Sequence, residues 1–259
     1  MRIPRVYLQA NLEPGTVVTL PLEEAHHLAR VLRRRSGDAV LLISLSGIFE
    51  GEIDNASDAS RESGELCVRV RVGGQTRDEV PSVLPWTLAV GVVKGESFDL
   101  VLRMASELGV GRVAPLWTAR AVVRPGRGSG SVVKKSERWA RVAREAAKQC
   151  GRAEPLVVAP PYELADFLKE CGDQDGRWIT VPGVSSLPGW MDGFFDREKG
   201  EVAPATFLVG PEGGFTPAEV ERALAAGFQP LGFPTPVLRT PTAVALIGAL
   251  GVLAGSQRP

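Results

Sequence analysis

The segment TFLVGPEGGFTPAE, residues 206–219, combines an apolar strand, a glycine-rich turn and the start of a helix. Its last part, Thr216-Pro-Ala-Glu219, has the pattern of a capping box with a proline in the first helical turn. In an α/β sheet, ligands bind beyond the carboxyl ends of the strands, and glycines let a ligand approach the main chain. The segment therefore predicts either a small-ligand site or a purely structural turn.

The segment LGFPTPVLRTPTA, residues 231–243, has the same order of predicted elements: a strand, a loop and then a helix. Two prolines, Pro234 and Pro236, stiffen its loop. Arg239 is the only cation between Arg222 and Arg258 in the sequence. This arginine can pair with Glu212 of the first segment or contact an anionic substrate, and the sequence favours neither alternative.

Upstream of these segments the chain alternates between strand and helix patterns. The predicted elements are a strand at Trp86–Val93, a helix at Glu96–Leu108, a strand at Val113–Leu116, a helix capped by Ser136 and ending at Cys150, and a strand at Trp178–Val181. Residues 119–135 are predicted to be a loop. Such alternation indicates an α/β domain built on a mostly parallel sheet.

Residues 1–73 have a different pattern, rich in short β-strands. Strands are predicted at 16–20, 39–44, 49–53 and 66–72, with a helix at Leu22–Arg34. This combination predicts a small barrel that carries a helix. The polar, proline-containing residues 74–85 then suit a linker, so the expected domains are 1–73 and 86–259.

The composition places the chain among globular proteins. It has 259 residues, of which 44% are hydrophobic and 23% charged, which excludes disorder of the whole chain. Three separated cysteines argue against a disulfide framework and for a reducing compartment. With no CxxC pair and only two histidines, which are adjacent, we expect no metal.

The sequence also predicts a soluble cytoplasmic protein. Its N-terminal residues lack the apolar core of a signal peptide. The longest uncharged apolar stretch, residues 241–256, is shorter than the roughly 20 residues of a membrane span. We therefore expect no membrane partner.

Charge is unevenly distributed, although Lys+Arg and Asp+Glu both number 30. Residues 94–152 carry 13 basic and 5 acidic groups, whereas residues 153–259 carry 7 and 13. Clustered cations bind phosphates with release of counterions, so the middle of the chain predicts nucleic-acid binding. A solvated helix face beside a loop is the alternative. The clustered cations are Arg120, Arg124, Arg127, Lys134, Lys135, Arg138, Arg141, Arg144, Lys148 and Arg152.

Five stretches, taken together in this order, are specific enough to indicate a family. They are EAHHLARVLRRRSGD (24–38), KGESFDLVLRMASELGVGRVAPL (94–116), SERWARVAREAAKQCGR (136–152), LVGPEGGFTPAEV (208–220) and LGFPTPVLRTPTA (231–243). The chain resembles the ribosomal RNA small subunit methyltransferase E family, which lies within the SPOUT superfamily of methyltransferases. The resemblance covers nearly the whole chain.

The resemblance implies a fold and an activity. The fold is an α/β SPOUT domain with a trefoil knot, preceded by a PUA-like β-barrel that helps to bind RNA. The implied cofactor is S-adenosylmethionine (SAM), and the implied partners are 16S ribosomal RNA of the small subunit and a second copy of the chain. The reaction would methylate N3 of a uridine.

The resemblance also assigns roles to the two loop segments. The cofactor would contact Leu208, Val209, Gly210, Pro211, Gly213, Gly214, Leu231, Gly232, Val237, Leu238, Thr240 and Thr242. Outside these segments, we expect RNA to contact Arg30, Arg33, Arg34, Arg120, Arg124, Arg138, Arg141, Arg144 and Arg152.

The chemistry of uracil suggests the catalytic groups. N3 must lose its proton before it attacks, so the site needs a base and a cation that stabilises the anionic ring. Arg239 is the preferred cation. Glu212 is one candidate base, and Glu107 and Glu145 are others that the sequence does not distinguish.

Three residues depart from the family pattern. Pro236 stands where the family commonly has an arginine, Pro241 where it has a glutamate, and Lys148 where it usually has an acid. These departures motivate an alternative function, that of a catalytically weak factor that binds ribosomal RNA during subunit assembly.

Overall fold

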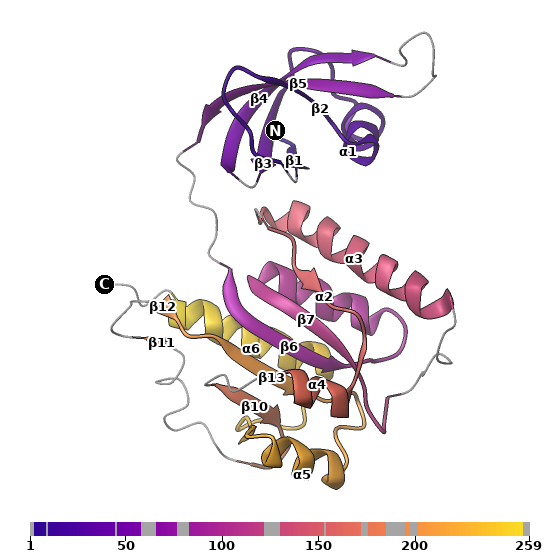
Figure 1. Ribbon diagram of the computed structural model, residues 1–259, viewed down its shortest axis with the longest axis vertical. Helices are drawn as coiled ribbons and strands as arrows, with labels where there is room; N and C mark the ends of the chain where they lie inside the picture. Colours follow the sequence, from indigo (N-terminus) through magenta and orange to yellow (C-terminus); the bar gives the residue numbers. More distant parts are fainter. Residues whose placement is uncertain are drawn as a thin grey trace. The chain divides into compact units, whose positions relative to one another are not determined.

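The chain divides into two compact units, residues 1–81 with 151–153 and residues 82–150 with 154–259 (Figure 1). The computed structural model describes residues 3–8, 10–44, 46–57, 66–76, 83–121, 130–152, 154–171, 176–184, 195–196 and 201–255.

The N-terminal unit contains a five-stranded sheet in the order β1-β3-β4-β5-β2. β1 runs parallel to β3, and the other paired strands are antiparallel. The strands are β1 (Arg5–Leu8), β2 (Val17–Thr19), β3 (Ala39–Ser44), β4 (Gly47–Ser57) and β5 (Cys67–Gln75). The sequence patterns did not predict β1, because four residues without a turn signal carry no local periodicity.

The helix of this unit is shorter than the predicted Leu22–Arg34. Its α-helical part, α1 (Leu22–His26), continues as a single π-turn, η1 (His27–Val31). Arg33 then adopts a φ of +50°, in the left-handed region, and ends the helical segment. Ala25 and Leu28 of this segment are fully buried in the core, whereas Leu22 and Leu32, expected on the same apolar face, are 59% and 40% exposed.

The C-terminal unit confirms the predicted α/β fold with a parallel sheet. Its seven-stranded sheet has the order β14-β10-β13-β6-β7-β8, and β9 also pairs with β7. All of these pairs are parallel. The strands are β6 (Leu84–Gly91), β7 (Val110–Trp117), β8 (Val157–Val158), β9 (Tyr162–Glu163), β10 (Arg177–Thr180), β13 (Ala205–Val209) and β14 (Gln229–Leu231), and β11 (Phe195–Asp196) pairs separately with β12 (Glu201–Val202).

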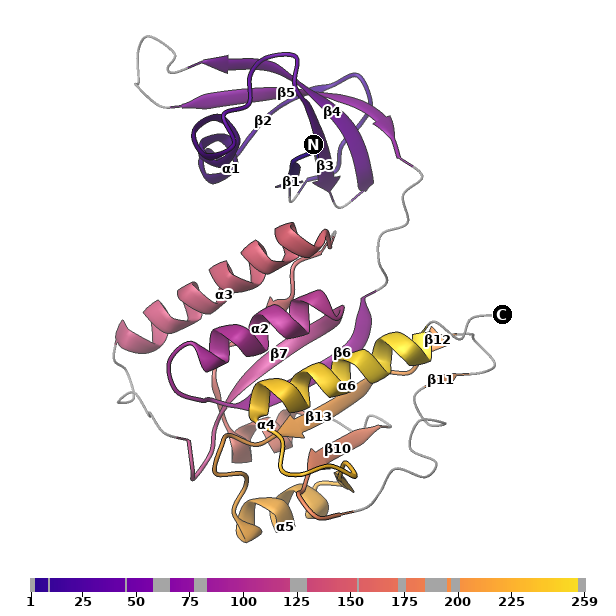
Figure 2. The ribbon, with the colours of Figure 1, turned by 180° about the vertical axis from the view of Figure 1, so that it is seen from behind.

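Helices cover both faces of this sheet (Figures 1 and 2). One face carries α2 (Ser97–Glu107), α3 (Gly130–Cys150) and α6 (Thr240–Gly255), and the other carries α4 (Leu164–Glu170) and α5 (Pro217–Ala225). Alternation along β6 explains the two cores: Leu88 and Val90 pack with the first group of helices, and Ala89 packs with the second.

The structure corrects the predicted start of α3. This helix begins at Gly130 rather than at Ser136, so Ser136 is not its cap and part of the predicted loop 119–135 is helical. Residues 131–135 contain neither proline nor glycine, so nothing in that stretch ends a helix. The sequence also missed α4, β8 and β9, since very short elements give no periodic signal.

Two features are absent from the described residues. None of their helices combines the length and apolar composition needed to cross a membrane. Nor do these residues include a group of three or more His, Cys, Asp and Glu side chains that could hold a metal ion.

Candidate cofactor-binding site

Three loops at one edge of the parallel sheet enclose a pocket of about 190 Å³. They follow β10, β13 and β14, which are neighbours in the sheet, so their carboxyl ends lie together. The pocket is lined by Thr180, Val181, Pro182, Gly183, Val209, Gly210, Pro211, Glu212, Gly213, Gly214, Leu231, Gly232, Phe233, Thr235, Pro236, Val237, Leu238, Thr240 and Ala243.

The loop after β13 is a tight turn that depends on glycine. The Gly214 N–H donates to the Pro211 carbonyl oxygen at 2.8 Å, and Gly214 has a φ of +65°. A Cβ atom on Gly210 would lie 3.0 Å from the Gly214 Cα. Side chains at these positions would therefore strain or widen the turn.

The predicted capping box is present at the start of α5. The Glu219 N–H donates to Thr216 Oγ1, and Glu219 Oε2 accepts from the Thr216 N–H at 2.8 Å. Glu219 Oε1 accepts a further bond, 2.7 Å long, from the N–H of Ala119 at the end of β7. This buried carboxylate thus ties β7 to the turn and to α5.

The loop after β14 is tied to the first turn by one side chain. Thr240 Oγ1 donates to the Gly210 carbonyl oxygen at 2.9 Å. Pro241 follows within the first turn of α6, where proline is tolerated because no intrahelical N–H bond is lost. Val237, on the rim of the pocket, is 76% exposed.

Ten of the twelve residues predicted to contact the cofactor line this pocket. They are Val209, Gly210, Pro211, Gly213, Gly214, Leu231, Gly232, Val237, Leu238 and Thr240. Leu208 does not line it, because its side chain points into the core on the other side of the strand. Thr242 is exposed on α6 and does not line it either.

Sequence reasoning missed the third loop, after β10. Residues 180–183 line the pocket, and the Thr180 hydroxyl donates to the Leu208 carbonyl oxygen at 3.2 Å. The available signal was Val181-Pro-Gly183, a turn directly after a predicted strand. Combined with the rule that ligands bind at carboxyl ends of strands, it could have identified this loop.

The two predicted catalytic residues, Glu212 and Arg239, differ in their position relative to the pocket. Glu212 lines the pocket, whereas Glu107 and Glu145, the other candidate bases, lie on α2 and α3 and do not. Arg239 is exposed and lies between two pocket residues, Leu238 and Thr240. Within the described parts of the chain, no ion pair joins Arg239 to Glu212.

The predicted cations of the C-terminal half have different surroundings. Arg141 and Arg144 are exposed on α3. Arg138 donates to Asp99 on α2 at 2.5 Å, and that carboxylate is only 8% exposed. Arg152 is buried, with 4% exposure, which does not suit a direct contact with RNA. Arg124 lies outside the described residues.

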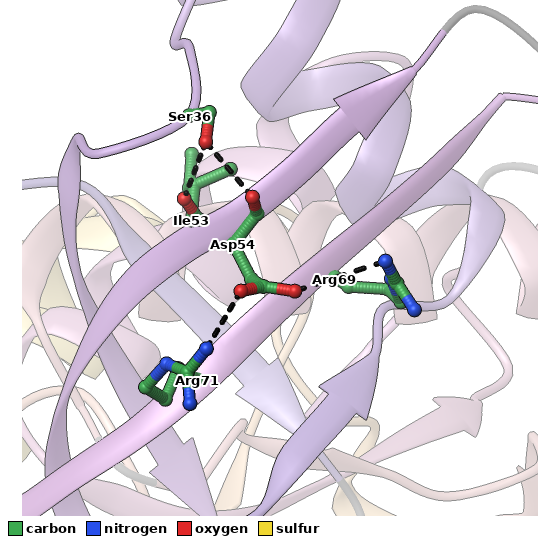
Figure 3. A network of polar contacts seen from close by, with 5 residues as sticks. All are labelled: Ser36, Ile53, Asp54, Arg69 and Arg71. Carbon is green, nitrogen blue, oxygen red and sulfur yellow. Dashed lines mark hydrogen bonds and ion pairs between the residues drawn. The ribbon is translucent and has the colours of Figure 1, made fainter.

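In the N-terminal unit, Arg30 and Arg33 are exposed and Arg34 is half-buried. The sequence did not single out Arg69 and Arg71, which flank the Asp54 carboxylate (Figure 3). Arg71 lies 2.9 Å and Arg69 3.8 Å from its oxygens. Both arginine side chains are about half exposed, so these pairs contribute little to stability.

A second, smaller cavity of about 100 Å³ lies near the amino ends of the strands. Thr206, Thr87 and Arg112 form one cross-strand row beside it, and Arg112 donates to Tyr162 Oη at 3.1 Å. Cys171 also lines it, and burial raises the pKa of this thiol despite a hydrogen bond with Thr206. This cavity is at the opposite edge of the sheet from the three loops.

Comparison with known proteins defines the class of this fold and pocket. Residues 80–251 match the family model described as an RNA methyltransferase domain. A Legionella pneumophila structure solved in complex with SAM is 28% identical, covers 99% of this chain and 98% of its own, and superposes with a TM-score of 0.80. The C-terminal unit is therefore an RNA methyltransferase domain.

Several relatives share one name that is more specific than the description of the family model. Ribosomal RNA small subunit methyltransferase E from Synechocystis sp. is 31% identical over 87% of this chain and 69% of its own length. The Bacillus subtilis protein of that name is 29% identical over 90% and 88%. A SAM-bound structure of that name from Neisseria gonorrhoeae is 26% identical, covers 96% of both chains and has a TM-score of 0.76. The chain belongs to the ribosomal RNA small subunit methyltransferase E family.

Proposed function

We propose that this protein transfers a methyl group from SAM to N3 of a uridine in 16S ribosomal RNA. The observation that carries the proposal is the pocket at the carboxyl edge of the sheet, enclosed by the segments through which the chain resembles its SAM-binding family. The relatives' printed names supply the ribosomal RNA substrate. The uridine and its N3 atom come from the family resemblance.

The residues of the pocket fit SAM. Val209, Leu231 and Leu238 offer apolar surface for the adenine ring and the methionine chain. The turn at 210–214 lacks side chains at three of its five positions, so the cofactor can approach main-chain amides and carbonyls. When bound, SAM supplies an electrophilic methyl group on its sulfonium.

The protein's task is then to prepare and position the uracil. N3 is a poor nucleophile while it holds its proton, and Glu212 lines the pocket where a base is needed. Arg239, exposed beside the same pocket, would stabilise the negative charge that the ring acquires. Holding N3 in line with the methyl group supplies the remaining rate enhancement.

We also propose a more specific fold for each of the two units. We assign the N-terminal sheet to a PUA-like barrel that binds RNA, and the C-terminal unit to the SPOUT class with a trefoil knot. The loops that the knot would involve approach each other closely: a Cβ atom on Gly232 would lie 1.6 Å from the Val184 carbonyl oxygen. The loops after β10 and β14 therefore press directly on each other.

We further propose a homodimer that buries α6. Residues 240–255 contain no charged side chain, yet Val252 and Leu253 are 46% and 54% exposed. The double change Val252→Asp and Leu253→Asp should weaken dimerisation about 30-fold, because burial of these half-exposed groups contributes about 2 kcal/mol. Sedimentation velocity at micromolar concentration measures it.

The matched control for the dimer is Val133→Asp, on α3, where the side chain is 59% exposed. This variant should sediment like the parent protein. A parent protein that is monomeric at micromolar concentration would contradict the dimer. Dissociation by Val133→Asp and not by the α6 changes would move the interface to α3.

The exposed face of α3 should bind RNA phosphates. Charge reversal at Arg141 and Arg144 should lower the slope of log affinity against log salt by about 1.5, since each lost phosphate contact removes about 0.7–0.9. Arg138 is left unchanged because reversal would set two carboxylates against each other at Asp99. Filter binding of a 16S fragment at several salt concentrations provides the slope.

As a control, Lys169→Glu with Arg222→Glu reverses two exposed charges on α4 and α5. These changes should leave the salt slope unaltered. Equal slopes for the parent and the α3 variant would mean that the α3 face is merely solvated.

The direct test of the proposed function is mass spectrometry of nucleosides from 16S ribosomal RNA, with and without the gene. Loss of N3-methyluridine, restored by the intact gene, is the expected result. The departures Pro236 and Pro241 favour one second candidate, a ribosomal RNA-binding assembly factor with weak catalysis. If the content of N3-methyluridine is the same with and without the gene, and subunit assembly is defective without it, that candidate is favoured.

A further inference from the structure

We propose that Arg120 is a positioning residue for the glycine-rich turn of the cofactor pocket, and not primarily an RNA contact. This inference rests on the proposed function, because it takes the turn at 210–214 to bind SAM. Arg120 is the third residue after Trp117, at which β7 ends. Its side chain reaches the turn after β13, although β6 lies between β7 and β13 in the sheet.

The contacts of Arg120 are with the main chain of the turn. Its Nη1 donates to the carbonyl oxygens of Gly213, at 2.7 Å, and Phe215, at 3.3 Å. Its aliphatic part lies against Gly213, where an added Cβ atom would be 3.2 Å from the Arg120 Cβ. One guanidinium therefore holds two carbonyls that are two residues apart.

These bonds fix two peptide planes, because the carbonyl and the N–H of a trans peptide point in opposite directions. In the peptide that follows Gly213, the oxygen faces Arg120 and the N–H donates to Pro211. In the peptide that follows Phe215, the oxygen faces Arg120 and the N–H of Thr216 donates to Glu219. Both planes are thus held from both sides.

Arg120 is itself held in place. The preceding N–H, that of Ala119, donates to Glu219 Oε1 at 2.7 Å. β7, the turn and α5 are therefore closed into one hydrogen-bonded ring through Arg120 and Glu219. Within the described residues no carboxylate pairs with Arg120, so the carbonyls of the turn are its polar partners there.

A preorganised turn binds its ligand more tightly, since less conformational entropy is lost on binding. Arg120→Ala should therefore raise the Kd for SAM about 10-fold, the scale of one charge-assisted hydrogen bond. Isothermal titration calorimetry measures this change without requiring turnover. In assays of methyl transfer, the KM for SAM should rise while kcat at saturating SAM stays within about two-fold of the parent value.

Two further variants separate the possible roles. Arg120→Lys keeps the charge but carries it on a more flexible stem, so it should recover SAM affinity only in part. It also provides the measurement if Arg120→Ala fails to fold. Arg222→Ala removes an exposed arginine of α5 and should leave the Kd for SAM unchanged.

The outcomes distinguish this inference from the proposed function. A parent protein that does not bind SAM would overturn the proposed function itself. A parent that binds SAM, with an Arg120→Ala variant of equal Kd but weaker RNA binding, would overturn the positioning role alone. A raised Kd with an unaltered salt slope of RNA binding supports it.

Discussion

Gly210→Val is expected to weaken SAM binding about 100-fold in a chain that still folds. The added Cβ atom alone would lie 3.0 Å from the Gly214 Cα and 3.3 Å from the Phe215 nitrogen, both main-chain atoms with little freedom to move. Relief of such overpacking displaces the turn that contacts SAM, so we expect a loss of binding free energy of about 2.7 kcal/mol, which corresponds to a hundredfold change in Kd. Calorimetric titration with SAM is the measurement.

Gly74→Val is the matched control for this change. Gly74 lies in β5 of the N-terminal unit, and a Cβ atom there would have no neighbour within 4 Å. We expect the control to bind SAM like the parent. Circular dichroism of both variants establishes that they fold. A folded Gly210→Val protein with parental SAM affinity would remove the 210–214 turn from the cofactor site.

The turn at 210–214 illustrates what the sequence alone could predict. A local pattern predicts a local structure, and the Thr216–Glu219 capping box and the strand before the turn were both found in this way. The parallel sheet followed from the alternation of strands and helices. Ten of the twelve residues that the family resemblance assigned to the cofactor line one pocket, and they lie in or after β13 and β14.

Contacts between distant segments lay beyond sequence reasoning. Arg120 was grouped with RNA-binding cations because its neighbours in sequence are basic, but its guanidinium bonds to Gly213 and Phe215. Arg138 was placed in the same group, and its partner Asp99 belongs to another helix. A charge count along the chain does not show which cations already have partners, because pairing depends on the fold.

The second large effect concerns Arg239. Arg239→Ala should lower methyl transfer about 100-fold, the scale expected for losing one preorganised group opposite developing charge. SAM affinity should stay within a few-fold, since the Arg239 side chain does not line the pocket. Arg239→Lys should rescue only in part, because a point charge does not reproduce the planar guanidinium. Single-turnover methylation of a small-subunit substrate with radiolabelled SAM provides the rate.

Arg222→Ala is the control for Arg239, since it removes another exposed arginine, on α5, and should leave the rate unchanged.

The surroundings of Arg239 limit the possible causes of a slower reaction. Because no ion pair to Glu212 is found in the described chain, a slower reaction cannot be assigned to the loss of such a pair. A near-normal single-turnover rate in Arg239→Ala would end the catalytic assignment. A parent protein that binds SAM and transfers nothing would instead trace the defect to Pro236 and Pro241, which replace the charged groups the family has on either side of Arg239.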